Sequence, residues 1–272
     1  MYQKIDQAAN YLRRFFKITP AAVVVVGDGF FDFSKEMQIP TAIRYQDIPF
    51  FPVNENNKNK ALIYGIFEGR YIVLMQDRPH KYEGFSYEDI AFPFQVFSTL
   101  GIPNVILTGV GGTLNEKINE DSFLLLRDHI SIFASNLFEG VLVPRLGNQF
   151  ADMSNVYNYQ LRQKIMEEAN KTTIDVKEGI YCYLPGPNFE TKSDARILKA
   201  LGADAVGMEM VPEASFAHYV GLNVIGIVLI THQAANLSNK TLVHRNILRA
   251  CEKNKVQTEF MVRTAIQVLP KE

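Results

Sequence analysis

Three apolar runs rich in β-branched residues constrain the fold more than any other feature of the sequence. They are Ala21–Val26, Asn104–Thr108 and Asn223–Thr231, and each is far too short to span a bilayer. Uninterrupted apolar runs of this length are typical of strands buried on both faces of a sheet, most often a parallel one. We therefore expect an α/β fold. Because no linker, repeat or low-complexity tract divides the chain, we expect one domain spanning residues 1–272.

The remaining elements follow from apolar periodicity and turn residues. Helical spacing predicts helices over residues 5–17, 87–100, 193–201 and 241–269. A further helix is expected from Phe150 to about Asn170, with Asp152 or Ser154 as its N-cap. A hairpin is predicted from strands at 61–67 and 71–76, and another strand at 123–130.

Composition excludes several classes of protein. The 28 basic and 29 acidic residues nearly cancel and form no block of one sign, so we expect no nucleic-acid partner. The first residues lack the apolar core of a signal peptide, and we expect a cytoplasmic protein with no membrane contact. Cys182 and Cys251 have no CxxC or histidine spacing around them, so two buried thiols are expected and no metal site.

Polar side chains gather in a loop directly after a predicted strand. Residues 77–84 bring Arg78, His80, Tyr82 and Glu83 together, which favours an anion or sugar site over a solvated loop. Glycine-containing loops are predicted at residues 27–29 and 109–115, where backbone N–H groups can approach an anion. A tight turn is the alternative interpretation of the first of these loops.

The stretch from Tyr181 to Ala214 carries a second group of candidate residues. An apolar run ends in a Pro-Gly-Pro turn that presents Phe189 and Glu190, and a second apolar segment delivers Met208 and Glu209 at its end. In open α/β sheets, ligands bind where neighbouring strands end. An aromatic ring, a thioether and two carboxylates suit a flat heterocycle with N–H donors and a sugar with hydroxyls.

With these residues in place, the sequence resembles the trimeric, low-molecular-mass purine nucleoside phosphorylases. The matching segments occur in the family's order over most of the chain. They are the Gly-loop at 27–29, Arg-Pro-His-Lys-Tyr-Glu-Gly at 78–84, Phe-Pro-Phe-Gln-Val-Phe at 92–97, Gly-Gly-Thr-Leu-Asn at 111–115, Arg-Asp-His-Ile at 127–130, Gly-Pro-Asn-Phe-Glu-Thr at 186–191, Gly-Ala-Asp-Ala-Val-Gly-Met at 202–208 and Val-Pro-Glu at 211–213.

The resemblance implies a phosphorylase/hydrolase-like fold with a mixed, partly barrel-like central sheet flanked by helices. It implies a homotrimer with active sites near subunit interfaces and a place in purine salvage. The reaction it implies is phosphate-dependent cleavage of 6-oxopurine (deoxy)ribonucleosides, such as inosine and guanosine, to the free base and (deoxy)ribose 1-phosphate. Phosphate is then a co-substrate, and no metal or organic cofactor is expected.

The resemblance also implies roles for individual residues. The expected phosphate ligands are Gly27, Asp28, Arg78, His80, the backbone N–H of Val110, and Glu209. The expected ribose contacts are Tyr82, Met208, Glu209, His244 and Phe150, the last lent by a neighbouring subunit. The expected purine contacts are Phe189, Glu190, His232 and Gln233, and the residues expected in catalysis are His80, Glu83, Glu190 and His232.

Glu190 carries the expectation about the base. Its carboxylate would accept hydrogen bonds from N1–H and, in guanine, from the 2-amino group, whereas adenine has no N1–H to give. This favours 6-oxopurines and argues against the methylthioadenosine branch of the family.

Two departures from the family fall at the phosphate. Asp28 and Glu209 stand where the family has serines that donate to phosphate, and an ionised carboxylate cannot donate. Three outcomes are open: Glu209 turns to the ribose hydroxyls, the carboxylates activate water in a nucleoside hydrolase, or the site binds a nucleoside without turnover. Lys58 lies nearest the place of the family's loop histidine and could supply a cation instead.

A third departure is at the purine, where His232 replaces the family's asparagine. A protonated imidazole could deliver a proton to N7, and a neutral one could still donate one hydrogen bond. In the alternative interpretation, Gln233 or Asn236 takes over this role and His232 packs at a strand end.

Overall fold

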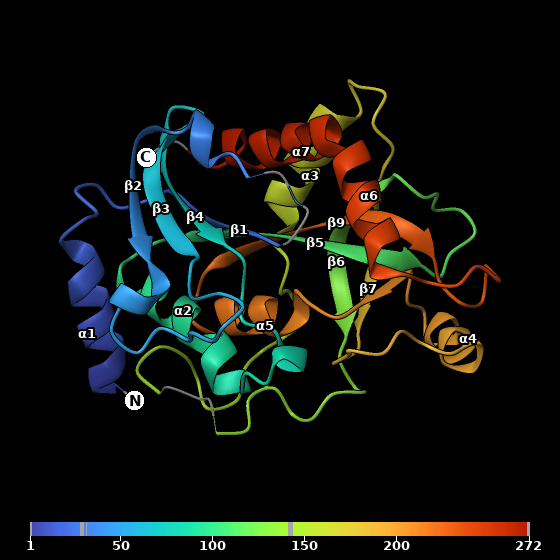
Figure 1. Ribbon diagram of the computed structural model, residues 1–272, viewed down its shortest axis with the longest axis horizontal. Coiled ribbons are helices and arrows are strands. Elements are labelled where there is room, and N and C mark those ends of the chain that lie inside the picture. Colours follow the sequence, from blue (N-terminus) through green and yellow to red (C-terminus); the bar gives the residue numbers. More distant parts are fainter. Residues whose placement is uncertain (1, 28–29, 31, 141–143, 271–272) are drawn as a thin grey trace.

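The computed structural model describes residues 2–27, 30, 32–140 and 144–270. It is built around a nine-stranded mixed sheet with the order β2-β3-β4-β1-β5-β8-β7-β6-β9 (Figure 1). β5 also pairs with β9, which closes strands β5 to β9 into a five-stranded barrel. The expected α/β fold with a partly barrel-like sheet is thus confirmed.

The strands take the following bounds: β1 Ala22–Val26, β2 Gln38–Arg44, β3 Ala61–Phe67, β4 Arg70–Gln76, β5 Asn104–Thr113, β6 Phe123–Ile130, β7 Val176–Tyr183, β8 Ala205–Gly207 and β9 Asn223–Gln233. β1 runs parallel to both β4 and β5, and β5 runs parallel to β9. β3 and β4 form the expected antiparallel hairpin. The three apolar runs thus lie at the centre of the sheet as neighbouring parallel strands.

Helices cover both faces of this sheet. α1 (Tyr2–Arg13), α2 (Tyr87–Thr99) and α5 (Val211–Tyr219) lie on one side, and α3 (Tyr159–Ala169), α6 (His244–Lys253) and α7 (Lys255–Gln267) lie on the other (Figure 1). α4 (Lys192–Ala200) packs against the barrel. Short 3-10 turns occupy Ser34–Glu36, Tyr45–Asp47 and Lys81–Glu83.

β1 shows why its apolar run is uninterrupted. Val23 and Val25 pack in the core with α1, α2 and α5, whereas Val24 and Val26 pack in the core with α3 and α7. Side chains alternate across a strand, so a strand covered on both faces needs apolar residues at every position.

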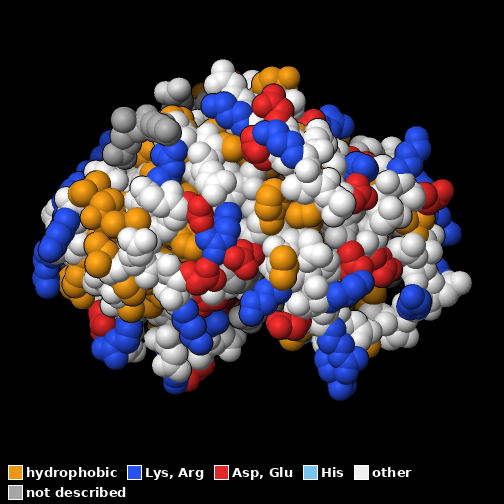
Figure 2. Space-filling model, turned by 90° about the horizontal axis from the view of Figure 1, so that it is seen from above, with side chains coloured by type: hydrophobic (Ala, Val, Ile, Leu, Met, Phe, Trp, Pro, Cys, Tyr) orange, Lys and Arg blue, Asp and Glu red, His pale blue; other side chains and the backbone are white. Residues whose placement is uncertain are grey.

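The predicted end of α2 and the two predicted buried thiols are confirmed by the structure. α2 ends before Gly101, whose φ of 79° is the left-handed conformation that glycine adopts most easily. Both cysteines are free and buried. Basic and acidic side chains are interspersed over the face seen in Figure 2. Within the described ranges, no helix is long and apolar enough to cross a membrane.

The prediction of a glycine-rich loop at residues 109–115 is wrong, because β5 continues through Thr113. Gly109 to Gly112 pair with β9. A Cβ added at Gly109 would come 2.4 Å from Sδ of Met210, and one at Gly112 would come 2.5 Å from Nε2 of His232. These glycines are therefore required by the close approach of neighbouring side chains, not by a turn.

The helix predicted to open at Phe150 is also wrong at its start. α3 begins at Tyr159, and the side chain of Asn158 caps it by accepting from the N–H of Leu161. Asp152 instead accepts from the backbone N–H and the hydroxyl of Ser154, in a local turn that competes with a helix. The helical stretch at 241–269 is divided in two at Asn254, whose φ and ψ are −98° and 17°.

Candidate active site

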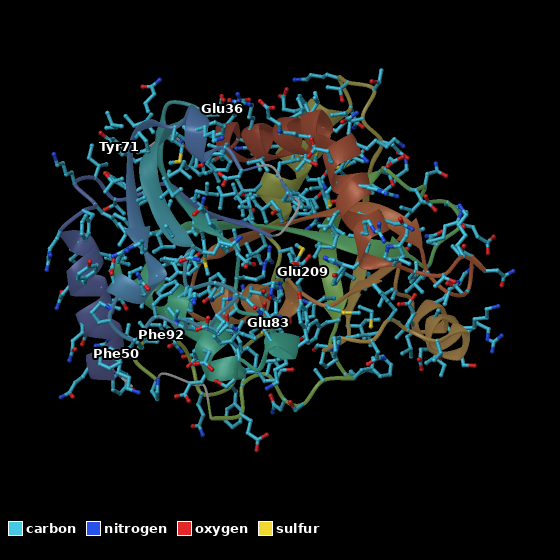
Figure 3. The ribbon with its side chains drawn as sticks, in the orientation of Figure 1. Glu36, Phe50, Tyr71, Glu83, Phe92 and Glu209 are labelled. Carbon is cyan, nitrogen blue, oxygen red and sulfur yellow. The ribbon has the colours of Figure 1, made fainter. Side chains whose placement is uncertain are left out.

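Four of the predicted phosphate ligands meet in the interior of the molecule. Arg78 and His80 follow β4, Val110 lies in β5, and Glu209 follows β8. Strands β4, β1, β5 and β8 are consecutive in the sheet, so residues at or near their ends are brought together. Figure 3 shows Glu209 and Glu83 close to one another near α5.

The carboxylate of Glu209 is bound by these predicted ligands. Its Oε1 accepts a hydrogen bond of 2.8 Å from the N–H of Val110. Its Oε2 lies 3.5 Å from Nε of Arg78 and 3.6 Å from Nε2 of His80. Burial alone would raise the pKa of Glu209, but Arg78, His80 and the N–H of Val110 together outweigh burial, and the pKa is lowered. The carboxylate is therefore ionised at neutral pH.

Arg78 is completely buried, which is unusual for a guanidinium without paired acceptors. Its Nη2 donates to the carbonyl of Thr108, and its Nη1 lies 3.6 Å from Oε1 of Glu213. Burial would lower the pKa of Arg78, but Glu209 and Glu213 outweigh it and raise the pKa. Arg78 is thus a fixed buried cation.

His80 is a second cation of this cluster. Its Nδ1 lies 3.1 Å from Oε2 of Glu83, and the same carboxylate oxygen accepts from the backbone N–H of His80. Burial would lower the pKa of His80, but the bonds with Glu209 and Glu83 raise it to about 9. The imidazole is therefore protonated at neutral pH.

Two of the predicted ribose contacts lie beside this cluster. The ring of Tyr82 stacks on that of His80, with centroids 4.7 Å apart. A Cβ added at Gly186 would come 2.6 Å from Sδ of Met208 and 3.4 Å from Cδ1 of Tyr82. Tyr82 and Met208 thus both lie against Gly186 of the Pro-Gly-Pro turn.

Glu190 and Phe189 follow this turn and form a separate group. Glu190 is only 7% exposed, and its Oε1 accepts a hydrogen bond of 3.1 Å from the N–H of Ala235. Burial raises the pKa of Glu190. The ring of Phe189 meets that of His232 edge to face, with centroids 6.1 Å apart. A hollow of about 260 Å³ lies against Phe189, Glu190 and Gln233.

His232 lies at the end of β9, above Gly112 of β5. Its Nδ1 is 2.9 Å from the hydroxyl of Thr231. Burial lowers the pKa of His232 to about 4, so the ring is neutral at pH 7. The structure therefore favours the neutral imidazole over the protonated one. A second hollow, of about 300 Å³, lies between His232 and α6.

Other predicted residues lie apart from these two groups or cannot be placed. His244 is exposed at the first position of α6, and Phe150 is 87% exposed. Lys58 makes an ion pair of 2.5 Å with Glu55, so its proposed role at phosphate is not supported. Asp28 lies outside the described residues.

Two further residues without a predicted role belong to the cluster. Glu213 is 2% exposed in α5 and faces Arg78, and Asn56 donates to Oε1 of Glu83 from the polar loop. The signal for Glu213 was present, because it is an acidic residue in a helix that is otherwise almost entirely apolar. No group of three or more His, Cys, Asp or Glu in the described part of the chain could hold a metal ion.

The chain is similar to known proteins over nearly its whole length. The sequence pattern described as the phosphorylase superfamily matches residues 21–267. Purine nucleoside phosphorylase 1 of Geobacillus stearothermophilus is 34% identical over 98% of both chains, and the rat purine nucleoside phosphorylase is 33% identical over 99% of this chain and 96% of its own. A crystal structure of Schistosoma mansoni purine nucleoside phosphorylase in complex with inosine superposes with a TM-score of 0.93 at 27% identity, covering 99% of this chain and 98% of that one.

Proposed function

The chain belongs to the trimeric-type purine nucleoside phosphorylases of the phosphorylase superfamily, and on that premise we propose that it cleaves 6-oxopurine nucleosides with phosphate. The substrates are inosine, guanosine and their deoxy forms. The products are the free base and (deoxy)ribose 1-phosphate.

One observation carries the phosphate-dependent reaction. Arg78, protonated His80 and the N–H of Val110 converge on one carboxylate, as donors do around an anion. Nε and Nη1 of Arg78 are buried and make no hydrogen bond to any described residue, because the ion pairs at 3.5 and 3.6 Å are too long. These N–H groups favour an acceptor placed closer than either glutamate, such as a phosphate oxygen.

In this proposal, a phosphate oxygen attacks C1′ of the sugar while the bond from C1′ to N9 breaks. The electron pair of that bond passes to the purine, which leaves as an anion and takes a proton. Arg78 and His80 hold the nucleophile, and Glu190 holds N1–H of the departing base. Neutral His232 donates one hydrogen bond to the base, so negative charge on the purine is stabilised as it develops.

Glu190 supports the choice of base. It is buried with one oxygen on the N–H of Ala235, and it borders the hollow that also touches Phe189. A carboxylate in this position suits a base with N1–H, because a donor compensates the charge that burial disfavours.

The assembly and location form part of the same proposal. We propose a homotrimer in the cytoplasm, in which Phe150 reaches the ribose of a neighbouring subunit. Its side chain is 87% exposed in the single chain, which supports a role in contact with another subunit.

Phosphate-independent hydrolysis is the second candidate, because Glu209 already fills the donors that phosphate needs. One experiment separates the two. The protein is incubated with inosine and with guanosine, with and without phosphate, and the base, ribose 1-phosphate and free ribose are measured. Base release that requires phosphate and yields ribose 1-phosphate supports phosphorolysis. Free ribose formed without phosphate would contradict phosphorolysis and indicate hydrolysis. Binding of nucleoside without release of base would indicate a nucleoside-binding protein.

A further inference from the structure

Both cations of the cluster around Arg78 already face carboxylates without a ligand. Arg78 and His80 are cations, and Glu209 and Glu83 are anions paired with them. A further carboxyl group, that of Glu213, lies 3.6 Å from Nη1 of Arg78, and burial raises its pKa. A phosphate that entered beside ionised Glu209 would bring further negative charge into a buried group in which carboxylates already face both cations.

Two glycines leave room for the carboxylate of Glu209. A Cβ added at Gly109 would come 2.8 Å from its Oε1, and one at Gly27 would come 3.4 Å from its Oε2. The first distance is one that real Cβ contacts do not reach, so Gly109 makes room for the carboxylate beside the N–H of Val110. The N–H of Val110 thus binds Oε1, and the guanidinium and the imidazole lie at ion-pair distance from Oε2.

We propose that Glu209 is an internal competitor for the phosphate subsite. Its carboxylate holds the donors that would hold phosphate, and phosphate binds only when that carboxylate leaves them. This inference rests on the proposed function, since it takes phosphate as the co-substrate. Its consequence is a weakened affinity for phosphate, so that turnover depends on the phosphate concentration over a higher range than a serine at this position would give.

Titration calorimetry with inorganic phosphate, without nucleoside, tests the competition directly. Glu209→Gln removes the charge at nearly constant size, and Glu209→Ser removes both charge and bulk. We expect phosphate to bind both variants at least about tenfold more tightly than the original protein. Glu116→Gln is the matched control: it removes a charge from an exposed carboxylate that pairs with Lys199 outside the cluster, so phosphate affinity should stay within about threefold of the original.

Equal phosphate affinity in the original protein and in folded Glu209→Gln and Glu209→Ser would overturn the proposal, and so would the absence of binding to all three. Circular dichroism establishes that each variant is folded. If the variants do not fold, a crystal structure of the unmodified protein at saturating phosphate decides. Phosphate on Arg78 and the N–H of Val110 with Glu209 displaced supports competition, whereas phosphate bound while Glu209 keeps both contacts contradicts it.

These results are distinct from the test of the proposed function. Tighter phosphate binding to Glu209→Gln, in a protein that releases no base from inosine or guanosine, would contradict phosphorolysis and leave the competition intact. Phosphate-dependent base release with equal phosphate affinities would contradict the competition alone.

Discussion

The two ends of the candidate site differ in how their charges are paired. At the anion end, formed by Arg78, His80, Val110 and Glu209, each charged side chain has a partner of opposite sign within the chain. At the base end, formed by Phe189, Glu190 and His232, the carboxylate of Glu190 bonds a backbone N–H and has no cation beside it in the described residues.

This difference predicts that the anion end contributes mainly to the stability of the fold and the base end mainly to substrate binding. Internal pairing makes the anion end part of what holds the fold together, because breaking one buried pair leaves the other charges uncompensated. The carboxylate at the base end is disfavoured by burial, so a donor of the proposed substrate would compensate it, and we expect the fold to depend on it little. Changes at the anion end should therefore alter stability, and changes at the base end should alter activity.

The largest expected effect comes from removing the buried cation of the anion end. Arg78→Met leaves Glu209 and Glu213 without their guanidinium, and we expect it to lower the free energy of unfolding by about 3–5 kcal/mol. Urea denaturation measures this. Arg145→Met is the control, because Arg145 pairs with Asp6 while 39% exposed and should cost no more than about 1 kcal/mol. If the two variants lost similar free energies of unfolding, the anion end would contribute no more to stability than an exposed ion pair, and the contrast with the base end would fail.

At the base end, Glu190→Gln should reduce activity while leaving the fold intact. A carboxylate can accept from both N1–H and the 2-amino group of guanine, whereas the NH2 group of an amide is itself a donor and faces one of them. We therefore expect kcat/KM for guanosine to fall by about a hundredfold. The free energy of unfolding should stay the same or rise, since a disfavoured buried charge is removed. Glu116→Gln, on an exposed carboxylate paired with Lys199, controls for the loss of charge. Near-full activity of Glu190→Gln would show that the base lies elsewhere.

The dependence of stability on pH tests the anion end again. The pKa of His80 is raised from 6.5 to about 9, so its contribution is fully present below about pH 6.5 and is lost as the pH rises through 9. We expect unfolding measurements at pH 6.5 and 9.5 to differ by about 2 kcal/mol more in the original protein than in His80→Asn. An equal dependence in both proteins would mean that the folded imidazole is not charged.

The smallest effect concerns the ribose, between the two ends. If Phe150 of a neighbouring subunit contacts the sugar, Phe150→Ala should raise KM for inosine by about three- to tenfold, the range of one aromatic contact. Tyr159→Ala, another aromatic that is 64% exposed, should leave KM unchanged. An unchanged KM in Phe150→Ala, or equal changes in both variants, would exclude the contact.

Much of the fold could be predicted because local patterns determine it. The apolar run of β1, the hairpin of β3 and β4, and the end of α2 at Gly101 follow from burial, alternation and backbone conformation. The glycines of β5 could not be distinguished from a loop, because the side chains that crowd them come from distant parts of the chain. A helix is predicted to begin at Phe150 because Asp152 or Ser154 resembles an N-cap, yet the Asp152 carboxylate accepts its hydrogen bonds from Ser154.

The site could be predicted as a set of residues but not as a geometry. Arg78 and His80 were recognisable from their loop, and Glu190 from its turn. The sequence does not reveal where the Glu209 side chain points, because this depends on which strand lies beside β8 and on the burial of Arg78. The neutral state of His232 likewise follows from burial, which no local pattern reveals.

β5 connects the two ends through its backbone. The carbonyl of Thr108 binds Arg78, the N–H of Val110 binds Glu209, and Gly112 lies under His232. Val110 and Gly112 are two residues apart in one strand, a separation of about 7 Å along the chain. The span between the anion end and the base end is therefore set by main-chain geometry inside a closed barrel. Side chains at either end can be exchanged in the course of evolution while that span, and the length of the molecule that bridges it, stays constant.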